Sequence, residues 1–214
     1  QELIERIKGH WEHEKLSYIQ RNTNRLLHLV NQLMDYRRAE LGIFELRPVY
    51  ANAYKKVLNC FLNYENLSKR KDIDYNLYTE LQDEELLFDE TYLDLIVNNL
   101  LSNAFKYTEK GECITVRLYK EDNNLVLQVI DTGVGIPAEK QKKIFERFYQ
   151  AESGHEGSGI GLSLVQRLVE LHHGHITLES KVGEGSTFSI YIPQDKSMYT
   201  SEELLAQEEG AKEQ

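Results

Sequence analysis

The sequence predicts an α+β fold, with helices packed on one face of a mixed β-sheet. Two observations predict it. Helical and strand-like patterns are mixed along the chain, and pairs of strands joined by short turns, typical of β-hairpins, come late in it. The sequence contains no internal repeat. A chain of 214 residues is long enough for one or two domains with a sizeable hydrophobic core.

A long helix is predicted ahead of the α+β region, from about residue 12 to residue 41. One apolar seam recurs along it at alternating spacings of three and four, the a/d pattern of a coiled coil, at Leu16, Ile19, Thr23, Leu26, Val30 and Leu33. A helix of that length, roughly 45 Å, cannot bury such a seam alone. We therefore expect a helical hairpin or a bundle partner, with a long core helix of a single domain as the alternative.

These patterns divide the chain into three regions. Residues 1–43 are expected to be part of a helical domain, with the end of one helix, a turn and the long second helix. Residues 44–194 are expected to form the α+β domain. Residues 195–214 carry six acidic and two basic residues and little apolar periodicity, so we expect a linker or a tail there.

The elements of the α+β region are predicted from periodicity and turn residues. Alternating or short apolar runs predict strands at 44–49, 73–78, 86–88, 113–119, 125–130, 176–180 and 187–192. A 3.6-residue period predicts helices at about 51–68, 90–107 and 159–172. Asp89 is placed to cap the second helix, and Gly174 is placed to end the third.

Charge and hydropathy exclude two classes of protein. The chain holds 25 Lys and Arg against 35 Asp and Glu, a net charge of −10, which argues against a general nucleic-acid binder. No apolar run approaches the roughly 18 residues that span a bilayer. Cys60 and Cys113 lack CxxC spacing, so we interpret them as reduced core thiols in a reducing compartment.

One polar side of a predicted helix is a candidate binding surface. Asn99, Asn103 and Lys106 are spaced i, i+4 and i+7, so they share a side of the helix. Two amides and an ammonium suit a Mg²⁺–phosphate ligand, because Mg²⁺ takes few ligands from protein and the rest from phosphate and water. A solvated polar stripe is the alternative, and spacing alone leaves both open.

Backbone freedom is concentrated in one stretch, where nine of the 13 glycines lie between Gly133 and Gly185. Asp131 ends a predicted strand just before this stretch, so its carboxylate can accept a hydrogen bond from a ligand amine while backbone comes close. Residues 154–162 open a predicted helix, where glycine N–H groups and the helix dipole favour phosphate. This segment matches neither the Walker A pattern nor a Rossmann fingerprint.

Taken in order, the motifs resemble the catalytic ATP-binding domain of bacterial sensor histidine kinases, in the superfamily shared with gyrase, a heat-shock chaperone and MutL. Five boxes carry the resemblance, which covers about 46–193: an N box at 99–108, a first glycine box at 131–135, an F box at 144–148, a second glycine box at 157–162 and a GxGTxF-like element at 183–188. The resemblance implies a Bergerat-type ATP-binding fold. The F box and the Lys-Tyr-Thr of the N box favour the histidine kinase branch.

The resemblance implies that ATP and Mg²⁺ bind between the helices and the sheet. Asp131 would accept from the adenine amino group, Asn103 would offer its amide oxygen to Mg²⁺, and Lys106 would meet phosphate. The residues expected to contact the nucleotide are Asn103, Lys106, Tyr107, Asp131, Gly133, Gly135, Gly157, Gly159, Gly161, Leu162 and Thr187. Residues 138–158 would form a mobile lid.

Two residues are implied in the transfer step. Asn99 would assist at the phosphates or at a metal-bound water. Arg147 of the F box would either stabilise charge in the transition state or make a structural pairing for the lid. Phosphoryl transfer depends on positioning and charge neutralisation more than on covalent chemistry by the protein, so such groups suffice.

The long first helix is similar to the second helix of the family's dimerisation domain, so we expect the intact protein to be a homodimer. The family's phosphoacceptor histidine lies in an H box, and His10, His13 and His28 lack that motif. We therefore expect this fragment to bind ATP without phosphorylating itself, and the intact kinase to relay phosphate to the receiver domain of a response regulator. The fragment is expected in the cytoplasm, outside the membrane, and its parent in the bacterial inner membrane.

Further alternatives stay open. A regulatory module of the same superfamily would bind nucleotide, or only a partner, without kinase activity. A gyrase- or MutL-like ATPase would hydrolyse ATP alone and would carry a glutamate at the position of Asn99. The acidic tail resembles the connector of hybrid sensors, which continue into a receiver domain. The histidines of 172–175 suggest a metal cluster, but a helix end with a glycine turn is the interpretation we favour.

Overall fold

The computed structural model describes residues 45–150, 159–201, 203 and 204, and in addition the single positions 15, 23, 30 and 34, which are helical. The long helix predicted at 12–41 is therefore described only at those four positions. The predicted site residue Gly157 and residues 205–214 lie outside the described residues.

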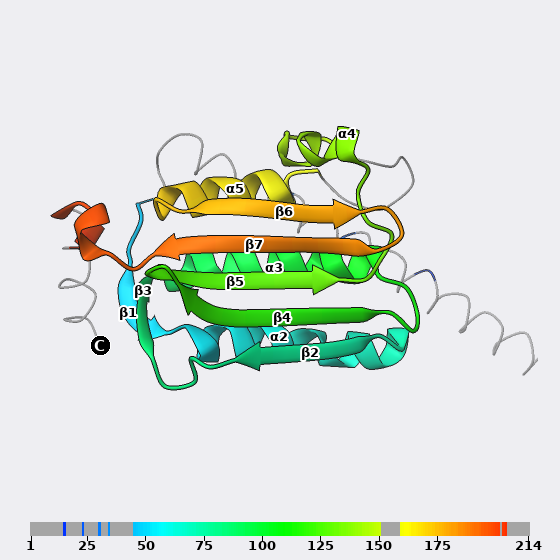
Figure 1. Cartoon of the computed structure of the whole chain (residues 1–214), viewed down its shortest axis with the longest axis horizontal. Helices are drawn as coiled ribbons and strands as arrows, with labels where there is room; N and C mark the ends of the chain where they lie inside the picture. Colours follow the sequence, from blue (N-terminus) through cyan, green and yellow to red (C-terminus); the bar gives the residue numbers. More distant parts are fainter. Residues whose placement is uncertain are drawn as a thin grey trace, which may run out of the picture.

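A five-stranded mixed sheet forms the centre of the domain, with strand order β2-β4-β5-β7-β6 (Figure 1). β2 pairs with β4 in parallel, and the other neighbours pair antiparallel. The strands are β2 Asp74–Thr79, β4 Cys113–Glu121, β5 Asn124–Asp131, β6 His175–Lys181 and β7 Gly185–Pro193. The two predicted hairpins are present as β4–β5 and β6–β7, and β2 and β6 form the edges of the sheet.

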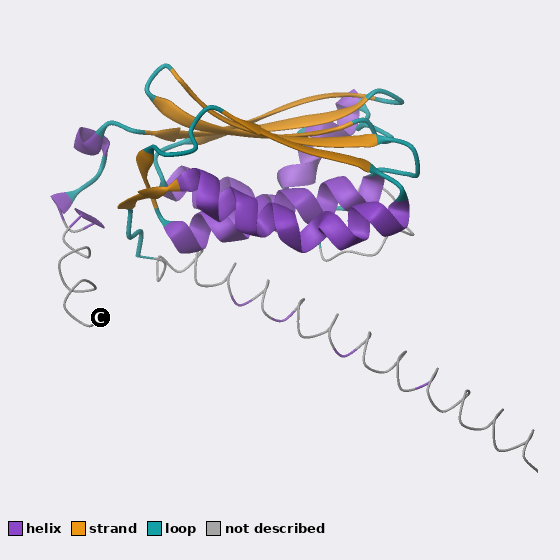
Figure 2. Cartoon of the chain, turned by 90° about the horizontal axis from the view of Figure 1, so that it is seen from below, coloured by secondary structure: helices purple, strands orange, loops and turns teal. Residues whose placement is uncertain are grey.

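Three helices pack against one face of this sheet: α2 Ala53–Lys71, α3 Glu90–Tyr107 and α5 Gly161–Leu171. Figure 2 shows helices gathered on one side of the sheet. The predicted α+β fold, with helices on one face of a mixed sheet, is confirmed. None of the helices in the described ranges is long and apolar enough to cross a membrane.

The core between the two layers is formed by apolar side chains at alternate positions of the strands and on one side of α3. Ile114, Val116 and Leu118 of β4 are fully buried. α3 contributes the buried residues Leu93, Ile96, Val97, Leu100 and Leu101. Fully burying one large apolar side chain stabilises a fold by about 1.5–3 kcal/mol. This core therefore fixes α3 against the sheet and decides which side of the helix stays accessible.

The start of α3 is held by the predicted cap. Asp89 Oδ1 accepts from the backbone N–H groups of Thr91 and Tyr92, at 2.9 and 3.1 Å. Asp89 Oδ2 accepts from the Arg47 N–H at 2.9 Å. A capping side chain of this kind contributes about 1 kcal/mol. One carboxylate thus fixes both the helix start and the chain that enters the domain.

The strand predicted at 44–49 lies further along the chain. β1 runs over Val49–Asn52 and pairs with β3, Glu85–Phe88, in a separate two-stranded sheet. Pro48 has no N–H to donate to a ladder, so pairing begins at the residue that follows it.

The segment predicted as a lid, 138–158, is described up to residue 150. It forms α4 (Ala138–Gln141) and the 3₁₀ helix η1 (Lys143–Phe145), which contact β6 and α5 respectively. Gln141 Nε2 donates to Ser180 O in β6 at 2.9 Å. The first part of the predicted lid is therefore fastened to an edge of the sheet.

The packed part of the chain extends beyond residue 194. The 3₁₀ helix η2 (Lys196–Met198) follows β7, and Tyr199 is only 5% exposed. The Tyr199 hydroxyl donates to Pro193 O at 2.9 Å. Tyr199, expected to belong to a linker, thus packs against the domain, whereas residues 195–198 are exposed.

His172 has a structural role at the end of α5. Its side chain is fully buried, Nε2 accepts from the Asp89 N–H at 3.0 Å, and Nδ1 lies 2.8 Å from Leu168 O. Because Nε2 accepts, Nδ1 carries the proton and donates to that carbonyl. Burial lowers the pKa of His172 below its ordinary 6.5. His175 stacks on Tyr191 instead, and the part of the chain with described placement holds no cluster of three potential metal ligands.

Replacing His172 by glutamine should reduce the loss of stability in acid. The native pKa lies below 6.5, so the unfolded chain takes up the proton first as the pH falls. The wild type therefore loses free energy of unfolding from about pH 6.5 downward, until the native histidine also protonates. Glutamine keeps an acceptor and a donor but does not titrate. Urea titrations at about pH 7 and pH 5 should show a smaller loss for His172→Gln. A loss equal to that of the wild type would contradict the assignment, and His175→Gln controls for the substitution itself.

Candidate functional site

The candidate site lies at one end of the sheet, where three elements meet. β5 ends there at Asp131 and α3 ends there at Tyr107, both at the right-hand side of Figure 1, and the Gly161 end of α5 is the end of that helix that points toward them. The first glycine box and the end of the N box, which are far apart in the sequence, are thus brought together, and the second glycine box opens a helix that starts on their side.

Asp131 is a buried carboxylate at the centre of this end. It is 7% exposed, and its Oδ1 accepts from the Gly133 N–H at 3.0 Å. In the sheet it lies between Ile114 of β4 and Ser186 of β7. Burial raises the pKa of Asp131 to about 6, although the N–H groups of Gly133 and Ser186 act in the opposite direction. Asp131 is therefore a buried carboxylate that can act as a hydrogen-bond acceptor.

The first glycine box is in direct backbone contact with the end of α3. A Cβ on Gly133 would lie 2.1 Å from Tyr107 O, so no side chain fits there. The Val134 N–H donates to the same oxygen at 3.3 Å. Gly135 has φ +68°, and a Cβ on it would lie 2.0 Å from Lys181 O. Glycine at both positions is what allows the loop to reach α3 on one side and the β6–β7 turn on the other.

The polar side of α3 is partly buried. Asn99, Asn103 and Lys106 are all intermediate in exposure, and the Asn99 amide nitrogen donates to Leu95 O at 2.8 Å. Lys106 Nζ lies 4.7 Å from the centre of the Tyr107 ring, a cation–π distance. The structure thus brings Lys106 and Tyr107 together and places Tyr107 against the loop that follows Asp131.

The F box and the second glycine box are joined through the backbone. The Phe148 N–H donates to Gly159 O at 2.9 Å. Gly159 has φ +69°, and a Cβ on it would lie 2.6 Å from the Phe148 carbonyl carbon. Phe148 itself has φ +61° and is 66% exposed. Arg147, beside it, has an exposed side chain.

The start of α5 offers backbone donors. Gly161 is its first residue, and the capping residue Ile160 makes no side-chain hydrogen bond to the helix end. The first N–H groups of a helix have no partner within the helix and carry the positive end of its dipole. Leu162 is partly buried and packs against the core, which fixes this end of the helix. The arrangement suits an anion bound at the N-terminal end of α5.

Thr187 is not brought together with the other predicted residues. It pairs with Ile130, and alternation along β7 turns its side chain to the sheet face opposite Asp131. The neighbouring Ser186 pairs with Asp131 and is 7% exposed, so it holds the place that we expected for Thr187. Alternate residues of a strand face the same side, so counting back by two from the core residue Phe188 would have identified Ser186 from the sequence.

Comparisons with known proteins bear on this site. Residues 88–196 match the family described as histidine kinase-, DNA gyrase B-, and HSP90-like ATPase. The circadian input-output histidine kinase CikA of Synechococcus elongatus is 33% identical over 189 residues, which are 86% of this chain and 25% of that protein. The autoinducer 2 sensor kinase/phosphatase LuxQ of Vibrio vulnificus is 36% identical over 182 residues, 80% of this chain and 21% of that protein.

A solved structure agrees with these relatives. Full-length ShkA in complex with AMPPNP aligns with a TM-score of 0.72 and 26% identity, over 78% of this chain and 35% of that one. The chain belongs to the histidine kinase-, DNA gyrase B- and HSP90-like ATPase family, as an ATPase domain of the sensor histidine kinase type. The resemblance carried by the five boxes is confirmed. The chain spans about a quarter of the length of the two curated relatives named above.

Adding one methyl group at Gly133 should disrupt the site. The new Cβ of Gly133→Ala would meet Tyr107 O at 2.1 Å, so the loop after Asp131 must move away from α3. We expect a stability loss of about 1–3 kcal/mol, as for overpacked cores, together with weaker binding of an ATP analogue in calorimetry. Gly111→Ala is the matched control, because Gly111 also needs a special backbone conformation (φ +81°) but has open space around it. Equal effects of the two variants on nucleotide binding would count against the contact.

Proposed function

We propose that this chain is the ATP-binding catalytic part of a sensor histidine kinase. In this proposal it transfers the γ-phosphate of ATP to a histidine located upstream of the chain, for relay to a response regulator aspartate. The observation that carries the proposal is the buried Asp131 carboxylate, held beside the end of α3 at Tyr107, with the N-terminal end of α5 directed toward this side of the domain. One side of the site offers an acceptor for a base, and the other offers donors for phosphate.

The base would be recognised by hydrogen-bond polarity. A buried carboxylate accepts hydrogen bonds, and adenine presents an amino group where guanine presents a carbonyl oxygen. Asp131 therefore favours adenine and repels guanine. Tyr107, whose backbone contacts Gly133, would flank the ring.

The phosphates would lie between α3 and the start of α5. Lys106 supplies a positive charge on the α3 side, and Gly159 and Gly161 supply backbone on the other. ShkA, a structural neighbour, is solved in complex with AMPPNP, which supports a nucleotide as the ligand here.

Mg²⁺ fits the donor set of this site. The described residues hold no cluster of three His, Cys, Asp or Glu that could bind a metal ion by themselves. Asn103, half-buried on the same side of α3 as Lys106, can offer one amide oxygen, and Mg²⁺ characteristically takes most of its other ligands from phosphate and water. When bound, the ion would neutralise part of the charge on the phosphates.

The transfer step needs positioned groups around the γ-phosphate. The hydrogen bond from the Asn99 amide nitrogen to Leu95 O fixes the orientation of that amide, which we propose acts at the phosphates or at a water molecule. Arg147 is exposed beside the backbone link between the F box and the second glycine box, where it can act on charge that develops during transfer. In the intact protein we propose a homodimer and a receiver domain as partners.

Asp131→Asn should lower the affinity for ATP at least about tenfold, because a hydrogen bond to a charged group is lost. Asparagine keeps one oxygen, which accepts from the Gly133 N–H, and places an amino group where the second carboxylate oxygen would accept from adenine. GTP should lose less affinity than ATP, or gain some, because the new amide can donate to its carbonyl. Calorimetry with both nucleotides and Mg²⁺ measures the change in preference.

Thermal melting separates this effect from a folding defect. The raised pKa of Asp131 means that its charge is unfavourable in the fold near neutral pH, so Asp131→Asn should not lower the melting temperature. Asp83→Asn, an exposed position, controls for the lost charge. Unchanged ATP affinity in Asp131→Asn would sink the assignment of the adenine site.

Phosphotransfer distinguishes the kinase from its alternatives. The chain should be extended upstream through the acceptor histidine of its parent and incubated with labelled ATP and Mg²⁺. We expect acid-labile phosphate on that histidine and none on the present chain alone. Nucleotide binding without transfer would indicate a regulatory module, and steady hydrolysis by the chain alone would indicate a gyrase-like ATPase.

A further inference from the structure

Part of the backbone of β6 faces no neighbouring strand. Ser180 O points away from β7, because Gln141 Nε2 reaches it from outside the sheet at 2.9 Å. Backbone groups alternate in direction along an antiparallel strand, so Ile176 and Leu178 also present their N–H and C=O groups to this outer edge. Within the described ranges these groups have no hydrogen-bond partner at that edge. Gln141 therefore covers only one end of the open edge.

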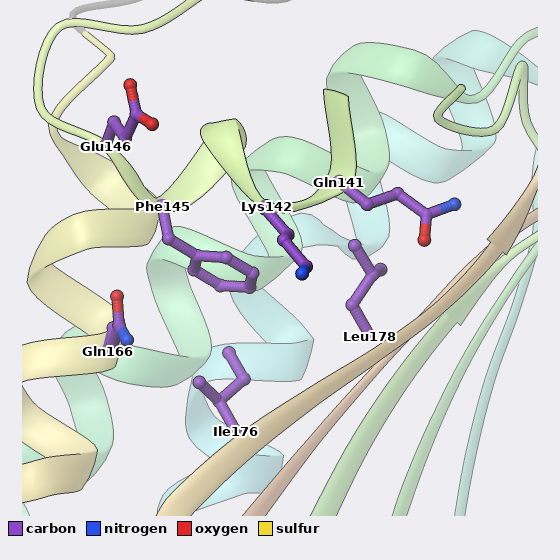
Figure 3. A pocket seen from close by; sticks show the side chains of 7 residues that line it. All are labelled: Gln141, Lys142, Phe145, Glu146, Gln166, Ile176 and Leu178. Carbon is purple, nitrogen blue, oxygen red and sulfur yellow. The ribbon is translucent and has the colours of Figure 1, made fainter. Parts of the chain in front are cut away.

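A cavity of about 480 Å³ opens beside this edge (Figure 3). Residues of α4 and η1, of α5 and of β6 line it: Gln141, Lys142, Phe145, Glu146, Gln166, Ile176 and Leu178. In Figure 3 the side chains of Phe145, Ile176 and Leu178 point into the same space. The cavity thus has an apolar wall directly next to unpaired strand backbone, and none of its lining residues is among those expected to bind the nucleotide.

A cation reaches into this apolar space. Figure 3 shows the Lys142 ammonium between the side chains of Phe145 and Leu178, whereas the Glu146 carboxylate turns away. Among the residues with described placement, Lys142 has no ion-pair partner. Lys142 is exposed, and a carboxylate that entered the cavity could pair with its ammonium.

We propose that an extended acidic peptide binds here as an additional strand on β6. Its backbone would pair with the open groups of Ile176 and Leu178, the mode of recognition in which a peptide extends a sheet. Alternate side chains of a strand face the same side, so two residues spaced i and i+2 enter the cavity together. One is apolar and packs on Phe145, and the other is a glutamate or aspartate that meets Lys142.

A peptide accounts for all the features of the site, and a small anion does not. A small amphiphilic carboxylate would satisfy Lys142 and the apolar wall, but it would leave the strand edge open. Open edges are a liability that proteins normally cover. An extended peptide covers the edge, fills the cavity and neutralises the charge.

The test uses a defined probe. An acetylated octapeptide of alternating threonine and valine, with a glutamate in place of one central valine, is titrated into the ¹⁵N-labelled chain. Amide signals of Ile176 and Leu178 should shift, and their hydrogen exchange should slow. The same peptide with lysine in place of glutamate should bind about two- to fivefold more weakly, the effect of one partly exposed ion pair. Lys142→Glu should reverse that preference.

A pair of variants isolates the backbone contribution. Leu178→Pro removes an N–H that faces away from β7, so the ladder with β7 is kept, and Leu178→Ala removes the side chain alone. The proline variant should bind the glutamate peptide more weakly than the alanine variant. Melting curves of both variants confirm that each remains folded.

Several outcomes would overturn the proposal. Equal affinity for the glutamate and lysine peptides, or no shifts at Ile176 and Leu178 up to the solubility limit, would do so. Amide signal shifts confined to the N box would also overturn the proposal. Hexanoate that produces the full set of shifts and the exchange protection would show a site for small anions instead.

Discussion

The backbones of three segments meet around Asp131, and two of their contact points leave no room for a side chain. A Cβ on Gly133 would lie 2.1 Å from Tyr107 O, and a Cβ on Gly185 would lie 1.9 Å from Asp131 O. The end of β5 is therefore enclosed by the end of α3 and the start of β7. This close packing sets how deeply the carboxylate is buried, and the apolar core of α3 then sets where Lys106 lies relative to it.

Two buried titratable groups act on stability in opposite directions. The raised pKa of Asp131, about 6, means that the native state binds its proton more tightly than the unfolded chain, so stability falls as the pH rises from 3.8 to about 6. The lowered pKa of His172 means the reverse, so stability falls as the pH drops below 6.5. His172 joins α3 to α5 and so serves the fold, whereas Asp131 lowers stability near neutral pH. A buried acceptor kept at such a cost is characteristic of a binding site.

The sequence correctly predicted the features that depend on residues close to one another in the chain. The Asp89 cap, the two hairpins and the spacing of the N box follow from short-range rules, and the order of the boxes identified the family. Predictions from the sequence were less accurate where the position of a residue depends on segments far away in the chain. The side chain of Thr187 faces away from Asp131, because alternation along β7 places it on the face opposite Ser186 and Phe188, and the motif match alone did not take that alternation into account. The Tyr199 hydroxyl donates to Pro193 O, but the acidic composition of residues 195–214 led us to expect a linker there. The first predicted strand was placed too early in the chain, because Pro48 has no N–H to donate to a ladder.

The most direct measurement is a crystal structure of this chain with AMPPNP and Mg²⁺. We expect that the adenine amino group donates to Asp131, that the phosphates lie at the N-terminal end of α5, and that Asn103 contacts the metal ion. A nucleotide bound at any other place, or with its adenine amino group directed away from Asp131, would contradict this expectation.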